Sequence, residues 1–203
     1  MPVAERLGER YPSVLLDHAS ERPPPGTLPV AYSMGARLVL HAALDEPDRW
    51  PGLLLTGVKA GVDDAEARRR SDQELADWIE ARPIEEVVER WENAPVFASQ
   101  PPELRAAQRP GRLSHEPAQL ARDLRRFGQG AMAPVWERLG ELEIPVLLIA
   151  GELDEPYVQA NRRMAALMPR AEQKVVPDCG HAPQLEAPDL VAAELRAFLD
   201  QRL

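Results

Sequence analysis

Short apolar segments that alternate with helical patterns constrain the fold of this chain more than any other feature. The candidate strands are residues 13–16, 52–58 and 144–150, with weaker candidates at 28–32 and 174–176. The helical patterns lie at residues 33–44, 157–168 and 188–203. Strands that alternate regularly with helices favour a mostly parallel sheet with helices on both faces. We therefore predict an α/β fold.

The stretch from residue 61 to residue 140 interrupts this alternation. It is rich in Glu, Arg and Ala, and its helical patterns lie at residues 65–81, 83–91 and 116–127. We interpret it as a helical insertion between two strands, which would cover the carboxyl edge of the sheet as a lid. Residues 1–60 and 141–203 would then be the first and second parts of the core, within one structural domain.

Composition narrows the classes of partner. The chain has 24 basic and 33 acidic residues and a net charge of −9, which disfavours nucleic acid or an anionic membrane as the main partner. Its single cysteine allows no internal disulfide and no Cys-based zinc site, so we predict no metal. The N-terminal residues are too charged for a signal peptide, and no apolar run approaches the ~20 residues of a membrane span. We therefore expect a cytoplasmic protein.

A junction between a strand and a helix carries the first candidate catalytic residue. The sequence VAYSMG at residues 30–35 places Ser33 between the two elements. It resembles the G-x-S-x-G nucleophile elbow of the α/β-hydrolases, with alanine in place of the first glycine. In such an elbow the backbone N–H after the serine, here that of Met34, helps to bind an oxyanion. A helix that begins with an N-cap serine has the same pattern.

Two later turns supply an acid and a histidine. Asp154 follows the apolar run at 144–150, and His181 lies in a glycine-containing turn before the last helical pattern. The order Ser, Asp, His along the chain is that of α/β-hydrolase triads. Glu152 and Glu155 compete with Asp154 for the role of the acid. The remaining candidates are interpreted as structural, solvated or packing residues: His18, His41, His115, Asp178 and Cys179.

Longer segments resemble one branch of the α/β-hydrolases, the 2-succinyl-6-hydroxy-2,4-cyclohexadiene-1-carboxylate synthases of menaquinone biosynthesis. The resemblance runs from about Tyr11 to the C-terminus. It is carried by YSMGAR at 32–37, EARRRSD at 66–72, WENAPVF at 91–97, GQG within 124–136, and GHA through LEAP at 180–188.

The resemblance implies a carbon–oxygen lyase that needs no cofactor. Such an enzyme eliminates pyruvate from 2-succinyl-5-enolpyruvyl-6-hydroxy-3-cyclohexene-1-carboxylate, with Ser33, His181 and Asp154 as the base. It also implies that the small polycarboxylate substrate is bound by Tyr32, Arg37, Arg68, Trp91 and Arg112. The alternative for Arg68 is an exposed cation, and for Tyr32 and Trp91 it is core packing.

Other functions stay open, because a fold alone does not fix an activity. One alternative is a carboxylic-ester or thioester hydrolase with the same triad, and another is a shortened, inactive relative that acts as a binding protein. Only 32 residues precede Ser33, fewer than the early strands and second oxyanion donor of the family need. Residues 16–20 resemble the strand-end P-G-H-G segment. We therefore expect a sheet without its early strands, weak activity, and self-association through an exposed sheet edge.

Overall fold

The computed structural model describes residues 2–16 and 22–202, which form two compact units. One unit consists of Met1–Ala60 with Val135–Leu203, and the other is Gly61–Pro134. Residues 17–21 lie outside the described residues. His18 and most of the segment 16–20 that resembles a strand end are therefore outside the described residues.

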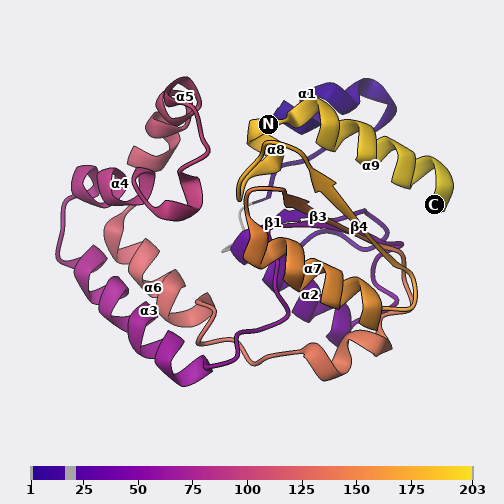
Figure 1. Ribbon diagram of the computed structural model, residues 1–203, viewed down its shortest axis with the longest axis horizontal. Helices are drawn as coiled ribbons and strands as arrows, with labels where there is room; N and C mark the ends of the chain where they lie inside the picture. The colour runs from indigo at the N-terminus through magenta and orange to yellow at the C-terminus, as the bar shows by residue number, and fades with distance from the viewer. Residues whose placement is uncertain (1, 17–21, 203) are drawn as a thin grey trace. The chain divides into compact units, whose positions relative to one another are not determined.

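The first unit is built on a parallel sheet, whose described strands are arranged in the order β1-β2-β3-β4 (Figure 1). These strands are β1 (Val30–Tyr32), β2 (Leu53–Thr56), β3 (Val146–Gly151) and β4 (Ala171–Val176). In the register of the sheet, Ala31 pairs with Leu55, and Leu55 pairs with Leu148. Because the strands are parallel, their carboxyl ends lie along one edge of the sheet.

Helices cover both faces of this sheet (Figure 1). On one face, Leu53 and Leu55 pack with α2 and α7, whereas Leu54 packs on the opposite face with α1 and α9. This alternation follows from the period of two in a strand. The elements are α1 (Pro2–Leu7), η1 (Gly8–Arg10), α2 (Ser33–Asp45), η3 (Trp136–Glu141), α7 (Glu155–Leu167), α8 (Pro183–Glu186) and α9 (Pro188–Arg202). The predicted α/β fold with a parallel sheet is confirmed.

One predicted strand is wrong. Residues 13–16 have no regular secondary structure, and Val14 and Leu15 are 84% and 65% exposed. An apolar run forms a buried strand only where a neighbouring strand accepts its backbone hydrogen bonds. In addition, β4 begins at Ala171, three residues before the predicted position. The helices α1 and α5 are not among the predicted ones.

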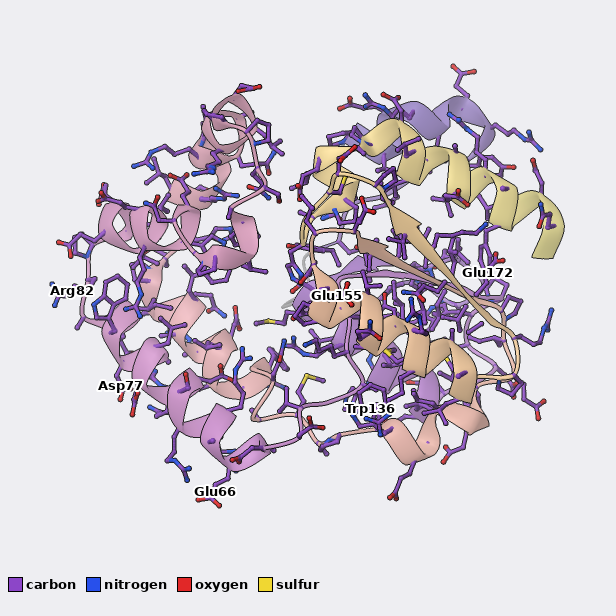
Figure 2. All side chains as sticks on the ribbon, in the orientation of Figure 1. Glu66, Asp77, Arg82, Trp136, Glu155 and Glu172 are labelled. Carbon is purple, nitrogen blue, oxygen red and sulfur yellow. The ribbon has the colours of Figure 1, made fainter. Side chains whose placement is uncertain are left out.

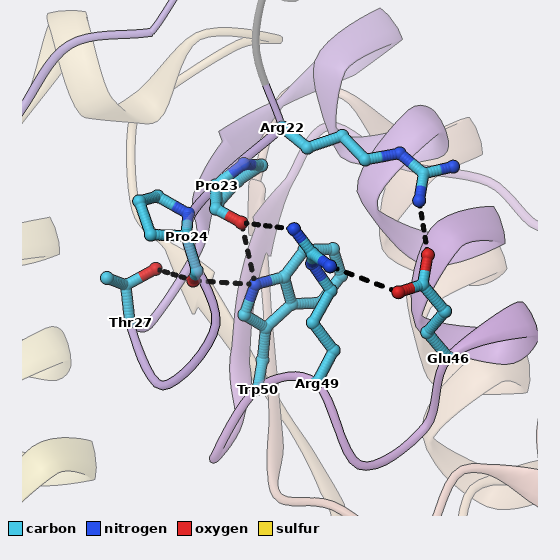
Figure 3. Close-up of polar contacts among 7 residues, drawn as sticks. All are labelled: Arg22, Pro23, Pro24, Thr27, Glu46, Arg49 and Trp50. Atoms are coloured by element: carbon cyan, nitrogen blue, oxygen red, sulfur yellow. Dashed lines mark hydrogen bonds and ion pairs between the residues drawn. The ribbon is translucent and has the colours of Figure 1, made fainter.

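The proline-rich connector before β1 is tied to the loop before β2 (Figure 3). The indole N–H of Trp50 donates to the carbonyl oxygens of Pro23 and Pro24, at 3.3 and 3.2 Å. Arg49 bridges the same region, because its guanidinium donates to Pro23 O at 3.3 Å and to the Glu46 carboxylate at 3.0 Å. Trp50 is 2% exposed, so this anchor is part of the core beneath α2.

The second unit is helical. Its elements are α3 (Ala65–Glu80), α4 (Ile84–Glu92), η2 (Pro95–Phe97), α5 (Pro102–Leu113) and α6 (Pro117–Phe127). Ala76 and Ile79 of α3 pack with Val87 of α4 and Ala121 of α6 in a small core. No helix in the described part of the chain is long and apolar enough to cross a membrane.

Candidate active site

Ser33 lies at an abrupt junction between β1 and α2. The strand ends at Tyr32, the helix begins at Ser33, and the backbone of Ser33 has a φ of 49°. This left-handed conformation costs a residue with a side chain about 1–3 kcal/mol, and such strain is concentrated at functional sites. The hydroxyl oxygen lies 3.1 Å from Nε2 of His181, a side chain from another turn. An N-cap serine would instead accept a hydrogen bond from the backbone of its own helix.

His181 is held between Ser33 and Asp154. Its Nδ1 lies 2.7 Å from Oδ2 of Asp154, and both residues are buried, with exposed fractions of 5% and 9%. A carboxylate beside Nδ1 favours the tautomer with the proton on Nδ1, which leaves Nε2 to accept from the Ser33 hydroxyl. An arrangement of this kind can remove the serine proton and return it later.

Backbone contacts join the turn that carries Asp154 to the turn that carries His181. The N–H of Leu153 donates to the carbonyl oxygen of Cys179 at 2.8 Å. Gly151 approaches the same turn so closely that a β-carbon on it would lie 2.1 Å from the Gly180 oxygen. The distance between acid and histidine is therefore set by main-chain packing as well as by the side chains.

The competing carboxylates contact other groups. Glu152 accepts a hydrogen bond from the backbone N–H of Asp178 at 3.2 Å, and Asp178 has a left-handed φ of 56°. Glu155 lies in the first turn of α7 (Figure 2). The Gln159 side chain donates a hydrogen bond to its carboxylate. Asp154 is thus the carboxylate on the imidazole. Glu152 and Asp178 shape the histidine turn.

Two tyrosines flank the imidazole. The ring centroids of Tyr32 and Tyr157 lie 5.3 and 4.5 Å from that of His181, both tilted. The ammonium of Lys59 lies 4.4 Å from the centroid of Tyr157. Sequence reasoning included Tyr32 but missed Tyr157 and Lys59. An aromatic residue in the first helical turn after the acid is the signal that could have identified Tyr157.

The other titratable candidates have different environments. Burial is the main cause that raises the pKa of the Cys179 thiol to about 11, which makes it a poor nucleophile at neutral pH. His41 is half-buried on α2, and burial lowers its pKa below the usual 6.5. His115 lies in an exposed bend after α5. Among the described residues, no group of three or more His, Cys, Asp or Glu side chains is arranged to hold a metal ion.

Met34 and Arg37 follow Ser33 on α2. Met34 is the second residue of the helix, where backbone N–H groups have no acceptor within the helix. Arg37 lies one turn further along and is 7% exposed. Its guanidinium keeps a positive charge at every ordinary pH.

The other predicted substrate-binding residues belong to the second unit, where other side chains already engage the two arginines. Arg68 donates from Nε to Asp72 at 2.7 Å and from Nη1 to the Gln129 side chain at 3.0 Å. Arg112 donates to Glu92 at 3.3 Å, and its guanidinium lies over the Phe97 ring.

Trp91 is the third predicted residue of this unit. Its ring is tilted against that of Phe97, with centroids 5.6 Å apart, and the residue is 48% exposed. This exposure disfavours the alternative of core packing, and the role of Trp91 in binding stays a prediction.

Comparisons with known proteins identify the family of this chain. Residues 4–194 match the profile of the family described as the alpha/beta hydrolase family. A Bacillus subtilis (strain 168) protein provisionally named a 2-succinyl-6-hydroxy-2,4-cyclohexadiene-1-carboxylate synthase is 35% identical over 176 residues. The match covers 84% of this chain and 64% of that protein. The synthase of that name from Serratia proteamaculans (strain 568) is 30% identical, with 84% and 66% covered.

The fold comparison gives a similar result. The solved structure of MenH from S. aureus superposes with a TM-score of 0.83 and 33% sequence identity. The match covers 87% of this chain and 69% of that one. The chain thus spans slightly less than two thirds of the length of the two curated relatives, and the predicted resemblance to this synthase branch is confirmed.

Proposed function

This chain is a member of the alpha/beta hydrolase family, and we propose that it is a carbon–oxygen lyase that eliminates pyruvate from 2-succinyl-5-enolpyruvyl-6-hydroxy-3-cyclohexene-1-carboxylate. The hydrogen-bonded series Ser33–His181–Asp154 is the observation that carries the proposal. The names of the two synthases that resemble this chain support the choice of substrate.

In the proposed reaction, Ser33 acts as a base. His181 accepts the proton of the Ser33 hydroxyl on Nε2, and the serine oxygen then removes a proton from the cyclohexene ring. The electron pair of that C–H bond forms a new ring double bond, the existing ring double bond shifts by one position, and the C–O bond to the enolpyruvyl group breaks with its electron pair on the oxygen. The departing enolate takes up a proton and becomes pyruvate. Asp154 stabilises the imidazolium that forms in between.

The substrate carries several carboxylates, which arginine side chains of the protein can bind. Arg37 is the cation that follows Ser33 on the same helix. Hydrogen bonds between a guanidinium and a carboxylate are charge-assisted, and their planar geometry orients a ligand. In this proposal Tyr32 also contributes to the pocket. Arg68, Trp91 and Arg112 are proposed to contact the substrate from the second unit.

The test is pyruvate release from the synthetic substrate by the wild-type chain and by Ser33→Ala and Asp154→Asn. We expect both substitutions to lower kcat, each by at least about 10³-fold, because triad members act as a unit. Hydrolysis of p-nitrophenyl esters without pyruvate release would favour a carboxylic-ester hydrolase. Calorimetric binding of the substrate without either reaction would favour a binding protein. Both outcomes would refute the lyase.

A further inference from the structure

A carboxylate other than Asp154 and Glu152 also binds the histidine turn. Glu186 is the last residue of α8, the short helix after His181. Its Oε2 accepts a hydrogen bond from the N–H of Gly180 at 2.9 Å, and its Oε1 accepts one from the N–H of Ala182 at 3.1 Å. Gly180 and Ala182 are the neighbours of His181 in the chain. One carboxylate therefore binds both backbone amides that flank the histidine.

These contacts restrain a part of His181 that Asp154 does not. Asp154 holds the ring through Nδ1, but the position of the ring also depends on the main chain that carries it. Hydrogen bonds from backbone N–H groups to a carboxylate are charge-assisted and stronger than those between neutral groups. We propose that Glu186 is a positioning residue, which holds the main chain of His181 so that Nε2 stays within reach of Ser33. This inference rests on the proposed role of His181 as a base.

Capping of α8 explains only one of the two hydrogen bonds that Glu186 accepts. Ala182 is the N-cap residue of α8, and Glu186, the fourth residue of that helix, accepts from its N–H as the glutamate at the third position of a capping box does. Gly180 lies two residues before the cap, so its bond to Glu186 adds nothing to the helix. The hydrogen bond from Gly180 instead restrains the turn that carries His181.

The triad leaves little tolerance for movement of this turn. The distance of 3.1 Å between Ser33 Oγ and His181 Nε2 is already at the long end for a hydrogen bond. A misplacement of about 1 Å in a reacting group can cost about 10²-fold in rate. A residue that fixes the turn should therefore affect kcat more than substrate affinity.

The test compares Glu186→Gln with Glu155→Gln in the full chain. The glutamine at 186 keeps one acceptor oxygen but directs an NH₂ group at the second backbone N–H, so one hydrogen bond becomes a contact between two donors. Glu155 is a matched control, because it is a glutamate beside Asp154 whose side-chain partner is Gln159. The measurements are the thermal midpoint, kcat and KM for pyruvate release, and the NMR signal of the His181 Nδ1 proton.

In Glu186→Gln we expect kcat to fall by about 10–100-fold, with KM changed by less than about threefold. The Nδ1 proton signal, assigned by its loss in His181→Gln, should broaden or disappear. Glu155→Gln should leave all of these values as in the wild type. If Glu186→Gln lowers the thermal midpoint but leaves kcat and the proton signal unchanged, Glu186 is only a helix cap and the proposal is wrong.

The proton signal separates this proposal from the proposed function. Loss of the signal in Glu186→Gln, in a wild type that releases no pyruvate, would support the positioning role and refute the lyase. If Glu186→Gln does not fold, hydrogen exchange of the Gly180 and Ala182 amides in the wild type tests the proposal instead. Protected Gly180 and Ala182 amides support the proposal, whereas exchange at the rate of an unstructured peptide would overturn it.

Discussion

The imidazole of His181 lies directly against the backbone of Gly57. A β-carbon on Gly57 would lie 2.9 Å from Cε1 of the imidazole and 3.2 Å from the His181 carbonyl oxygen. The glycine has a left-handed φ of 57°, and its N–H donates to the Ile149 oxygen on β3 at 3.2 Å. The turn after β2 is thus fixed to the sheet and forms one wall of the space that His181 occupies.

Gly57→Ala is therefore expected to lower both stability and activity. A left-handed backbone costs alanine about 1–2 kcal/mol, and the contact with Cε1 forces either the turn or the ring to move. A moved ring no longer meets Ser33, so kcat for pyruvate release should fall by about 10²-fold. Thermal denaturation and the release assay measure the two effects.

Gly111→Ala is the control for this substitution. Gly111 lies within α5, and a β-carbon there would meet nothing within 4 Å. Replacing a helical glycine by alanine stabilises a protein by roughly 0.5–1 kcal/mol. A Gly57→Ala variant as stable and as active as Gly111→Ala would mean that His181 does not need the close approach of this turn.

In the second unit, Asp72→Asn should destabilise the packing of α3 with the segment after α6. Asp72 is 4% exposed, and its carboxylate accepts from Arg68 Nε at 2.7 Å and from the Gly130 N–H at 3.1 Å. Replacing these charge-assisted bonds is expected to lower the free energy of unfolding by about 1–3 kcal/mol. Hydrogen exchange of the α3 and α6 amides localises the effect.

Asp77→Asn tests whether the destabilisation by Asp72→Asn is caused by the burial of Asp72. Asp77 lies on the outside of α3 (Figure 2). Arg125 donates to its carboxylate at 2.7 Å. An exposed ion pair contributes little, because water and salt screen it. Equal destabilisation by the two substitutions would contradict the structural role given to Asp72.

The sequence predicted most of the sheet because strand and helix boundaries have local causes. β2 and β3 are apolar except for Thr56 and are bounded by Pro, Gly or charged residues, so their pattern can be recognised without tertiary contacts. The run at 13–16 has a similar composition, yet none of the described strands pairs with it. α5 was missed because its sequence is polar and contains Pro110, which normally disfavours a helix interior.

The candidate triad was predictable because each member follows a strand, and parallel strands end at the same edge. The supporting contacts were not predictable, because they join residues distant in sequence through the main chain. Gly57 against His181 and Gly151 against Gly180 are examples. A glycine in a sequence indicates where another part of the chain can lie close to the backbone. It does not indicate which residue lies there.

The stability of the chain should decline in mild acid partly because of His41. Burial is the main cause that lowers the pKa of this imidazole below 6.5. The positive charges of Arg37 and Arg138 lower it further, whereas the negative charge of Asp45 raises it. As the pH falls below about 6.5, the unfolded chain therefore binds a proton before the native chain does, and the free energy of unfolding decreases.

His41→Gln removes this contribution. Denaturant titrations at several pH values between about 7.5 and 5 should give a flatter dependence for His41→Gln than for the wild type. His115→Gln is the control, because His115 is exposed. Parallel curves for the wild type and His41→Gln would contradict the prediction, because they would mean that burial does not lower the pKa of His41.

Arg37→Ala separates a lyase from an ester hydrolase. If Arg37 binds a carboxylate of the substrate, its loss removes a charge-assisted contact of about 1.5–3 kcal/mol, which lowers kcat/KM for pyruvate release by roughly 10–150-fold. A neutral p-nitrophenyl ester makes no such contact, so its hydrolysis by the same triad should change by less than about twofold.

Arg37 is buried, so its substitution also needs a check on folding. Arg162→Ala removes an exposed arginine from α7 and should leave the thermal midpoint and both reactions as in the wild type. If Arg37→Ala lowers both reactions equally, along with the thermal midpoint, Arg37 supports the fold. If pyruvate release falls alone while the midpoint stays within a few degrees, the charge of Arg37 acts on the substrate. Unchanged pyruvate release would exclude Arg37 from substrate binding, because a missing charge-assisted contact must appear in kcat/KM.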